Sequence, residues 1–274
     1  MTSQTARASI APSPILLRER IGHVAVLTLN RPDARNSLSE GLIAELDAAL
    51  HEIHDDAKIR AVVIAATGKA FSAGHDMKEL TAHRGDADRG RGYFAKIMTA
   101  CSAMMQAIVH LPKPVVAAVQ GIATAAGCQL VATCDLAIAS EAASFATPGV
   151  DIGLFCSTPM VALSRAVPRK QAMEMLLTGE PISAANAHNI GLVNRVVPDG
   201  TEREAAIEMA QKVALKSAYT IKIGKAAFYH QAEMNLAGAY RYAAEVMTEN
   251  LMAHDAEEGI GAFIEKREPK WQDR

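Results

Sequence analysis

Several patterns are scarce or missing in this chain of 274 residues, and each absence excludes a class of protein. Lysine and arginine number 28 against 30 for aspartate and glutamate, so the chain lacks the positive surplus that nucleic-acid backbones attract. The longest apolar run, residues 114–126, is interrupted by Gln120 and Gly121 and is shorter than the roughly 18 residues needed to cross a bilayer. The glycine patterns of dinucleotide and P-loop sites are missing, as is the GxSxG pattern of serine hydrolases. We therefore expect neither nucleic acid nor membrane as a partner.

The four cysteines form no CxxC pair and have no histidine at metal-ligand spacing, so we expect buried free thiols and no metal site. They are Cys101, Cys128, Cys134 and Cys156. Free thiols are typical of a reducing compartment, and the expected location is cytoplasmic. Residues 1–14, rich in Ala, Ser and Thr, are predicted to form a flexible arm. A mitochondrial transit peptide is the alternative interpretation of this arm, with Arg7 as its only basic residue.

Half of the residues are apolar, which suffices for one large α/β core. Alternating apolar runs at 15–20 and 23–30 predict an opening β-hairpin, and Ser37 followed by Glu40 predicts a capping box at the start of an amphipathic helix. Three wholly apolar runs predict parallel strands that are buried on both faces. They are residues 61–66, 115–119 and 136–139. The first two thirds of the chain are thus expected to repeat strand and helix units around one core.

After residue 168 helical spacing dominates, with a strand signal only at 193–197. We therefore divide the chain into an arm at 1–14, a core at 15–200 and a C-terminal helical region at 201–274. This last region is expected to cover either its own core or a neighbouring subunit.

Two segments have the order strand, small-residue turn, helix, and they are the strongest functional signals. They are AVVIAATGKAFSAGHDM at 61–77 and VVAAVQGIATAAGCQLVATC at 115–134. Small residues let a ligand approach the backbone, and a helix start directs unpaired N–H groups toward it. Two such turns facing each other would form an oxyanion hole. Tight helix packing through small residues is the alternative explanation.

Five ordered motifs resemble those of the crotonase (enoyl-CoA hydratase/isomerase) superfamily. FSAGHDMKE is similar to FxAGxDxKE, and PKPVVAAVQGIATAAGCQLVATCDLAIAS is similar to PKPxxAAxxGxxxGGGxxLxxxxDxxxA. NRPDARNSLS, LLTGEPISAANAHNIGLVNRVVP and AFIEKREPKW resemble three further family segments. The motifs occur in the family's order, and the resemblance runs from about Ile15 to Trp271.

The resemblance implies a crotonase-like spiral of ββα repeats and homotrimers, often paired into hexamers. It also implies an acyl-CoA thioester ligand, with coenzyme A as part of the substrate and no separate cofactor. The thioester oxygen would lie between the main-chain N–H groups of His75 and Ala126. Coenzyme A itself would contact the turn at 31–36, the backbone near Ala73, and a C-terminal helix of the same or a neighbouring subunit. The residues implied for coenzyme A are Arg31, Ala34, Asn36, Ala73, Phe263 and Lys266.

The sequence departs from the resemblance at the two glutamates that family hydratases use as acid and base. Gln129 stands at the first position and Gly149 at the second. An amide does not titrate and glycine has no side chain, so the two-glutamate hydration mechanism does not transfer. Gln129 remains a candidate for orienting water or substrate, Asp151 is a candidate carboxylate, and His75 beside Asp76 is a candidate pair.

Two functions remain open. The first is an acyl-CoA hydratase, isomerase or related lyase of fatty-acid or similar metabolism, with an unusual acid or base. The second is a noncatalytic or regulatory acyl-CoA binder. The segment FATPGVDIGLFCSTP resembles a subgroup that lacks the same two glutamates, which indicates a coherent variant site rather than decay and favours an enzyme.

Overall fold

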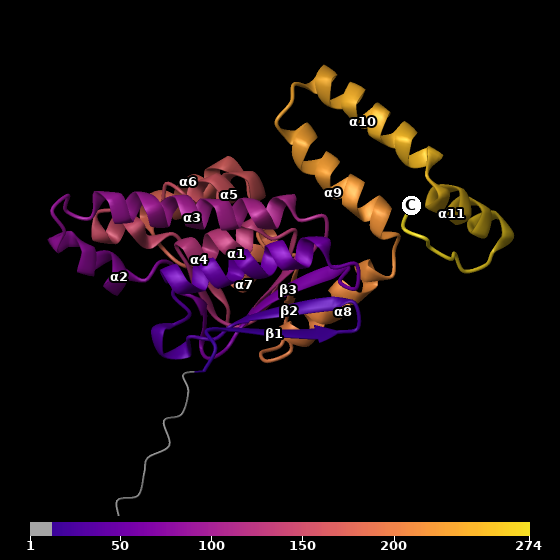
Figure 1. The fold of residues 1–274 in the computed structure, drawn as a ribbon. Helices are drawn as coiled ribbons and strands as arrows, with labels where there is room; N and C mark the ends of the chain where they lie inside the picture. Colours follow the sequence, from indigo (N-terminus) through magenta and orange to yellow (C-terminus); the bar gives the residue numbers. More distant parts are fainter. Residues whose placement is uncertain (1–12) are drawn as a thin grey trace, which may run out of the picture.

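A computed structural model describes residues 13–274, so most of the predicted arm lies outside the described residues. The fold centres on a large sheet of six strands in the order β1-β2-β3-β5-β7-β10 (Figure 1). β1 and β2 form the predicted antiparallel hairpin, and the other neighbours pair in parallel. The strands are β1 (Leu16–Ile21), β2 (Val24–Leu29), β3 (Ala61–Ala66), β5 (Val115–Val119), β7 (Leu136–Ser140) and β10 (Arg195–Val197).

Both faces of this sheet are buried, as the wholly apolar runs predicted. Alternate residues of a strand point to opposite faces, so Val62 and Ile64 of β3 pack with the helices on one side. Ala61 and Val63 pack on the other side, against Ala210 and its neighbours on α8 (Glu202–Ala214). The strand that carries the first functional turn is therefore fixed from two directions.

A smaller sheet of four strands was not predicted. Its order is β4-β6-β8-β9, with β4 (Ala70–Ser72), β6 (Ile122–Thr124), β8 (Ser144–Ala146) and β9 (Ile182–Ser183). Each of β3, β5 and β7 is followed by one strand of this smaller sheet and then by helix, which is the expected ββα repeat. The helices of these repeats are α2 (Met77–Ala82), α3 (Arg91–His110), α4 (Ala126–Thr133), α5 (Pro159–Ala166), α6 (Arg169–Thr178) and α7 (Ala184–Asn189).

The first helix, α1 (Glu40–Asp55), has its cap two residues after the predicted one. Ser39 is the N-cap, and its side chain accepts a hydrogen bond from the Leu42 N–H. The hydroxyl of Ser37, predicted as the cap, instead donates to Asp76 at 3.1 Å. The prediction of the cap was wrong because Ser37 is buried beside a long-range partner that the local pattern does not reveal.

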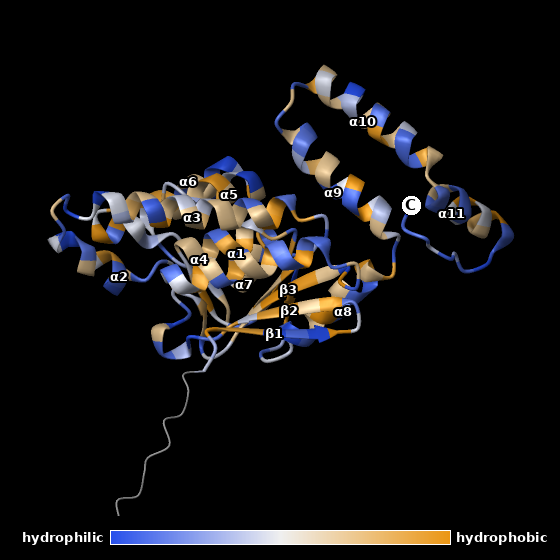
Figure 2. Cartoon of the chain, in the orientation of Figure 1, coloured by the Kyte–Doolittle hydropathy of each residue, from blue (hydrophilic) through white to orange (hydrophobic). Residues whose placement is uncertain are grey.

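The C-terminal region divides into two parts. α8 packs on the large sheet, whereas α9 (Ala218–Ala232), α10 (Leu236–Met252) and α11 (His254–Glu265) project beyond it (Figure 1). Apolar residues lie exposed along the projecting helices (Figure 2). Among them are Phe228, Leu236, Tyr240, Met247, Met252, Phe263 and Ile264. Within residues 13–274, no helix is both long and apolar enough to span a bilayer.

Candidate active site

The two small-residue turns lie in contact. A Cβ placed on Gly74 would lie 2.9 Å from the Ala125 Cβ and 3.3 Å from the Ala126 nitrogen. A Cβ on Gly127 would lie only 2.2 Å from the Ser72 carbonyl oxygen. Both positions therefore require glycine for close approach, and Gly74 also has a positive φ of 86°.

Two main-chain N–H groups are left free at this contact. Leu38 donates to the Gly74 carbonyl and accepts from the Asp76 N–H, so the His75 N–H between them points away from Leu38. Ala126 is the first residue of α4, where an N–H has no partner within the helix. Among the described residues, neither N–H donates a hydrogen bond to the backbone. The contact thus joins two available donors.

The residue before the second donor is strained. Ala125 has φ 49° and ψ −118°, a region that residues with a Cβ rarely adopt. Its N–H is bonded to the Ala146 carbonyl at 2.9 Å, and its carbonyl accepts from the Gln129 N–H at 3.0 Å. The small sheet and α4 therefore hold Ala125 in a conformation that costs of the order of 1–3 kcal/mol. Sequence reasoning did not find this strain.

The side chain of His75 does not pair with Asp76. The Asp76 carboxylate accepts from Arg31 at 2.9 Å and from Ser37, and it caps α2. Burial opposes its ionisation, but these hydrogen bonds outweigh burial and hold the pKa of Asp76 below 3.8. Both imidazole nitrogens of His75 are buried without a partner in the described chain, and burial lowers the pKa of His75 below 6.5. Burial thus favours the neutral form of the ring, which has no carboxylate to orient it.

The turn at 31–36 packs against the segment that carries the His75 N–H, since it bonds to Ala73 and Asp76 on either side of that residue. Asn36 is buried and donates to the carbonyls of Thr67 and Ala70, both at 2.8 Å. The Ala73 N–H donates to the Arg35 carbonyl at 3.0 Å, which joins the turn to the strand β4. Ala34 ends the short 3-10 helix η1 (Pro32–Ala34). Four of the residues implied for coenzyme A, Arg31 and Ala34 with Asn36 and Ala73, thus lie in one place.

The other two implied residues lie elsewhere in the same chain. Phe263 and Lys266 belong to the end of α11, and Phe263 is 84% exposed. The tail after α11 attaches through Asp273 to Arg60, which precedes β3, whereas the turn at 31–36 packs against the residues that follow β3. These two attachments are at opposite ends of the strand, so one chain alone does not bring Phe263 and Lys266 to the turn.

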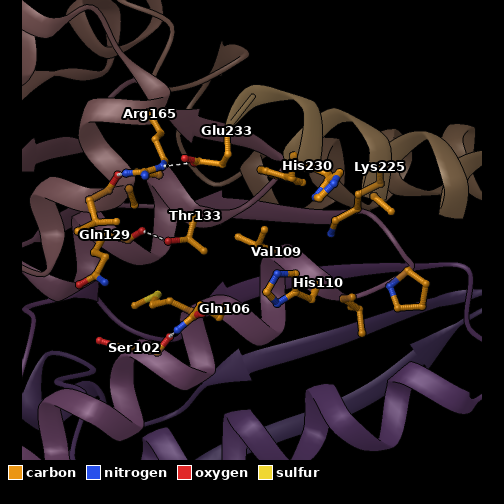
Figure 3. Close-up of a pocket in the computed structure, with 18 of the residues that line it drawn as sticks. Ser102, Gln106, Val109, His110, Gln129, Thr133, Arg165, Lys225, His230 and Glu233 are labelled. Atoms are coloured by element: carbon orange, nitrogen blue, oxygen red, sulfur yellow. Dashed lines mark hydrogen bonds and ion pairs between the residues drawn. The ribbon is translucent and has the colours of Figure 1, made fainter. Parts of the chain in front are cut away.

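Gln129 lies one turn into α4, at the end of a cavity of about 960 Å³ (Figure 3). Its side-chain oxygen is buried and has no hydrogen-bond partner in the described residues. Asp151 belongs to the short helix η3 (Pro148–Ile152), is exposed, and does not line this cavity. Of these two candidates, the amide of Gln129 lies at the cavity and the carboxylate of Asp151 does not.

The space beside Gly149 is already filled. A Cβ at this position would lie 2.7 Å from the Leu154 carbonyl oxygen and 2.9 Å from the Cys156 sulfur. Cys156 is itself buried, and burial raises the pKa of its thiol. A larger side chain at Gly149 must therefore displace the segment that follows it.

We expect Gly149→Ala to destabilise the fold by about 1–3 kcal/mol, since the added methyl overpacks this contact. Gly149→Glu should cost at least as much. Thermal denaturation measures the effect, and Gly224→Ala on α9 is the matched control because nothing lies within 4 Å of a Cβ there. Equal melting temperatures for Gly149→Ala and the wild type would contradict the packing described for this position.

A buried ionic cluster attaches α9 to the core, and it was not found from the sequence. The Lys225 ammonium donates to Asp135 at 2.6 Å and to the carbonyls of Ile108 and Lys113. The Tyr229 hydroxyl donates to the other oxygen of Asp135 at 2.8 Å. Burial lowers the pKa of Lys225, but each of its three donors has an acceptor. This cluster fixes one wall of the cavity.

Comparison with known proteins gives close relatives over nearly the whole chain. Human enoyl-CoA hydratase domain-containing protein 3, mitochondrial, is 45% identical over 97% of this chain and 86% of its own. The crystal structure of that human protein has a TM-score of 0.89 and covers 94% of this chain and 100% of its own. An enoyl-CoA hydratase from Mycobacterium smegmatis is 50% identical, with a TM-score of 0.89, and covers 94% of this chain and 99% of its own.

The human relative corrects one expectation. It is named as a mitochondrial protein, which contradicts the cytoplasmic location that we expected from the free cysteines. Reduced thiols were a weak guide, because they report on redox conditions and not on the compartment itself.

The sequence model of the family described as enoyl-CoA hydratase/isomerase matches residues 19–274. This range includes all of the motifs on which the resemblance rests and nearly all of the described structure. The alternation of β3–β4, β5–β6 and β7–β8 with helices agrees with the expected spiral. The chain therefore belongs to the enoyl-CoA hydratase/isomerase family of the crotonase superfamily.

Proposed function

We propose that this protein binds an acyl-CoA thioester and stabilises its enolate oxygen between the N–H groups of His75 and Ala126. The observation that carries the proposal is the pair of free donors on two touching turns. Negative charge grows on the thioester oxygen as an enolate forms, and fixed donors need no reorganisation to stabilise it. One such donor is worth about 3–4 kcal/mol in comparable sites.

Hydration by two glutamates is not part of the proposal. Gln129 offers an amide, which can orient a substrate group or water but cannot accept its proton. At Gly149 the room for a carboxylate is taken by Leu154 and Cys156. We therefore favour an isomerase or lyase that passes through the enolate without these groups. A noncatalytic acyl-CoA binder is the second candidate, favoured by the missing partner for His75.

We propose that coenzyme A contacts the turn at 31–36 and the backbone of Ala73. The Arg31 guanidinium is occupied by Ser37 and Asp76, so its role is to hold the turn. Arg35 is exposed, and its guanidinium has no hydrogen bond or ion pair within residues 13–274, which leaves it available to a phosphate. Phe263 and Lys266 would be supplied by a neighbouring copy.

This use of a neighbouring copy requires an oligomer, and we propose a homotrimer or a dimer of trimers. The exposed apolar residues of α9, α10 and α11 support this proposal, because contiguous apolar surface of that kind is typical of an interface.

Titration calorimetry with acyl-CoA thioesters, followed by mass spectrometry of the products, tests the proposed function. We expect acetoacetyl-CoA to bind more tightly than free coenzyme A, because its enolate places charge at the two donors. Crotonyl-CoA hydration should be slower than in a two-glutamate hydratase by a factor of about 10² or more, since each acid or base group typically supplies that much. Equal affinity for free coenzyme A and acetoacetyl-CoA would refute the oxyanion hole, and hydration at the ordinary rate would refute the role given to Gln129.

A further inference from the structure

The cavity at Gln129 extends far from the two main-chain donors, neither of which lines it. It runs between α3, α4 and α5 on one side and α9 on the other, with a volume of about 960 Å³. Figure 3 shows Gln129 and Ser102 at one end and Lys225 toward the other, with His110 and His230 between them. A ligand whose reacting group lies at Gln129 therefore has a path toward the basic residues of α9.

Part of the wall of this cavity is apolar. Met105 and Val109 of α3 face it, as do Ala132 of α4 and Val161 of α5. Met105 and Val109 are four residues apart, so they lie on the same face of their helix. This part of the wall suits the methylene groups of an acyl chain.

The far part of the path carries positive charge without a matching carboxylate. Glu233 is the only acidic residue of the described chain that lines the cavity, and its carboxylate accepts from Arg165 at 3.1 Å. Lys225 is neutralised by Asp135 behind the wall. Lys222 also lines the cavity and lies three residues before Lys225 on the same face of α9. Within residues 13–274, Lys222 has no ion pair.

Two histidines also line the cavity, between its two ends (Figure 3). His110 at the end of α3 and His230 on α9 both line the cavity, and neither has a carboxylate partner in the described residues. The His230 ring instead packs edge-on against Tyr242 at a centroid distance of 4.8 Å. His54, a third lining histidine, is already bonded to Asp55. At the far end, a negatively charged group would therefore meet the ammonium of Lys222, which is unpaired among the described residues.

We propose that the preferred ligand is an acyl-CoA whose acyl chain ends in a carboxylate, the monothioester of a dicarboxylic acid. Its methylene groups lie along the apolar part of the cavity wall, and its terminal carboxylate pairs with Lys222. A carboxylate that enters a partly desolvated cavity needs such a partner, since an unpaired one is strongly disfavoured. This inference rests on the proposed function, because a thioester held at Ala126 is what would place the acyl chain at Gln129, one helical turn further along α4.

Paired ligands of equal chain length test the proposal. Calorimetry on the full-length protein would compare each plain acyl-CoA with the acyl-CoA of the same length that ends in a carboxylate, over a series of lengths. We expect the carboxylate to improve affinity by about 3- to 10-fold at one optimal length, the amount of a partly exposed ion pair. At shorter lengths the carboxylate should weaken binding, because it then lies in the apolar part.

Lys222→Met removes the charge and keeps the length of the side chain. It should abolish the preference for the carboxylate and leave the affinity for plain acyl-CoA within about 2-fold, because the plain chain gains nothing from the ammonium. Lys212→Met, at an exposed lysine of α8 outside the cavity, is the matched control and should keep the preference.

Three outcomes would overturn the inference. Equal affinities within every pair would overturn it and leave the proposed function intact. A preference that survives in Lys222→Met, or a change of oligomeric state in that variant measured by light scattering, would assign the lysine another role. Failure of both ligand classes to bind would refute the proposed function together with the inference.

Discussion

Proline at position 126 is expected to reduce enolate stabilisation by a factor of about 10² or more, because it removes one of the two donors. Proline fits the first residue of a helix, which Ala126 is. Its ring, however, would clash with the Cβ of a preceding residue, and Ala125 is already strained. The informative variant is therefore Ala126→Pro in an Ala125→Gly background.

Ala125→Gly alone is the control. Glycine adopts the positive φ without a steric penalty, so this variant should fold at least as well as the wild type and keep both donors. The ultraviolet absorption of bound acetoacetyl-CoA reports its enolate fraction, and turnover can be followed once a substrate is known. If the double variant folds, binds and ionises acetoacetyl-CoA as Ala125→Gly does, the N–H of Ala126 has no part in the function.

Asp135→Ala should destabilise the protein by about 3–5 kcal/mol, because it leaves the Lys225 ammonium buried without its carboxylate. Only 7% of the Lys225 side chain is exposed, so water cannot replace the lost partner. The variant also removes acceptors from the Tyr229 hydroxyl and the Val115 N–H. Urea denaturation gives the free energy of unfolding, and proteolysis between α8 and α9 should become faster.

The double variant Asp135→Asn/Lys225→Met separates charge from packing. It removes both charges and keeps an amide oxygen that can accept from Val115. We expect it to be more stable than Asp135→Ala, since no unpaired charge remains. A loss of less than about 1 kcal/mol in Asp135→Ala would mean that solvent reaches Lys225 and that the cluster does not hold α9.

The sequence was sufficient for the family and for the large sheet, because these depend on local patterns. The run at 61–66 is apolar at every position and becomes the strand β3, covered on both faces. The smaller sheet escaped prediction because strands such as β4 and β9 have only three and two residues, too few for a periodic signal.

The features of the site that were missed depend on how the chain folds back on itself and not on a local pattern. The cap moved to Ser39 because Ser37 bonds to Asp76, which is 39 residues away. The crowding at Gly149 depends on a carbonyl and a sulfur that return to it from residues 154 and 156. Asp135 belongs to one of the family motifs, but its partner Lys225 lies 90 residues later in the sequence. No spacing rule connects such pairs.

The placement of α9 has a consequence for how the molecule accommodates ligands of different size. This helix forms a wall of the cavity while belonging to the projecting part of the chain, and the Asp135–Lys225 contact fastens it. The remaining walls come from α3, α4 and α5, whose buried residues are part of the main core. The cavity thus has walls that belong to the main core and one wall, α9, that a single ionic cluster attaches to that core. We expect a bulkier ligand to be accommodated by a shift of α9 about this cluster, without repacking of the interior that positions the two donors.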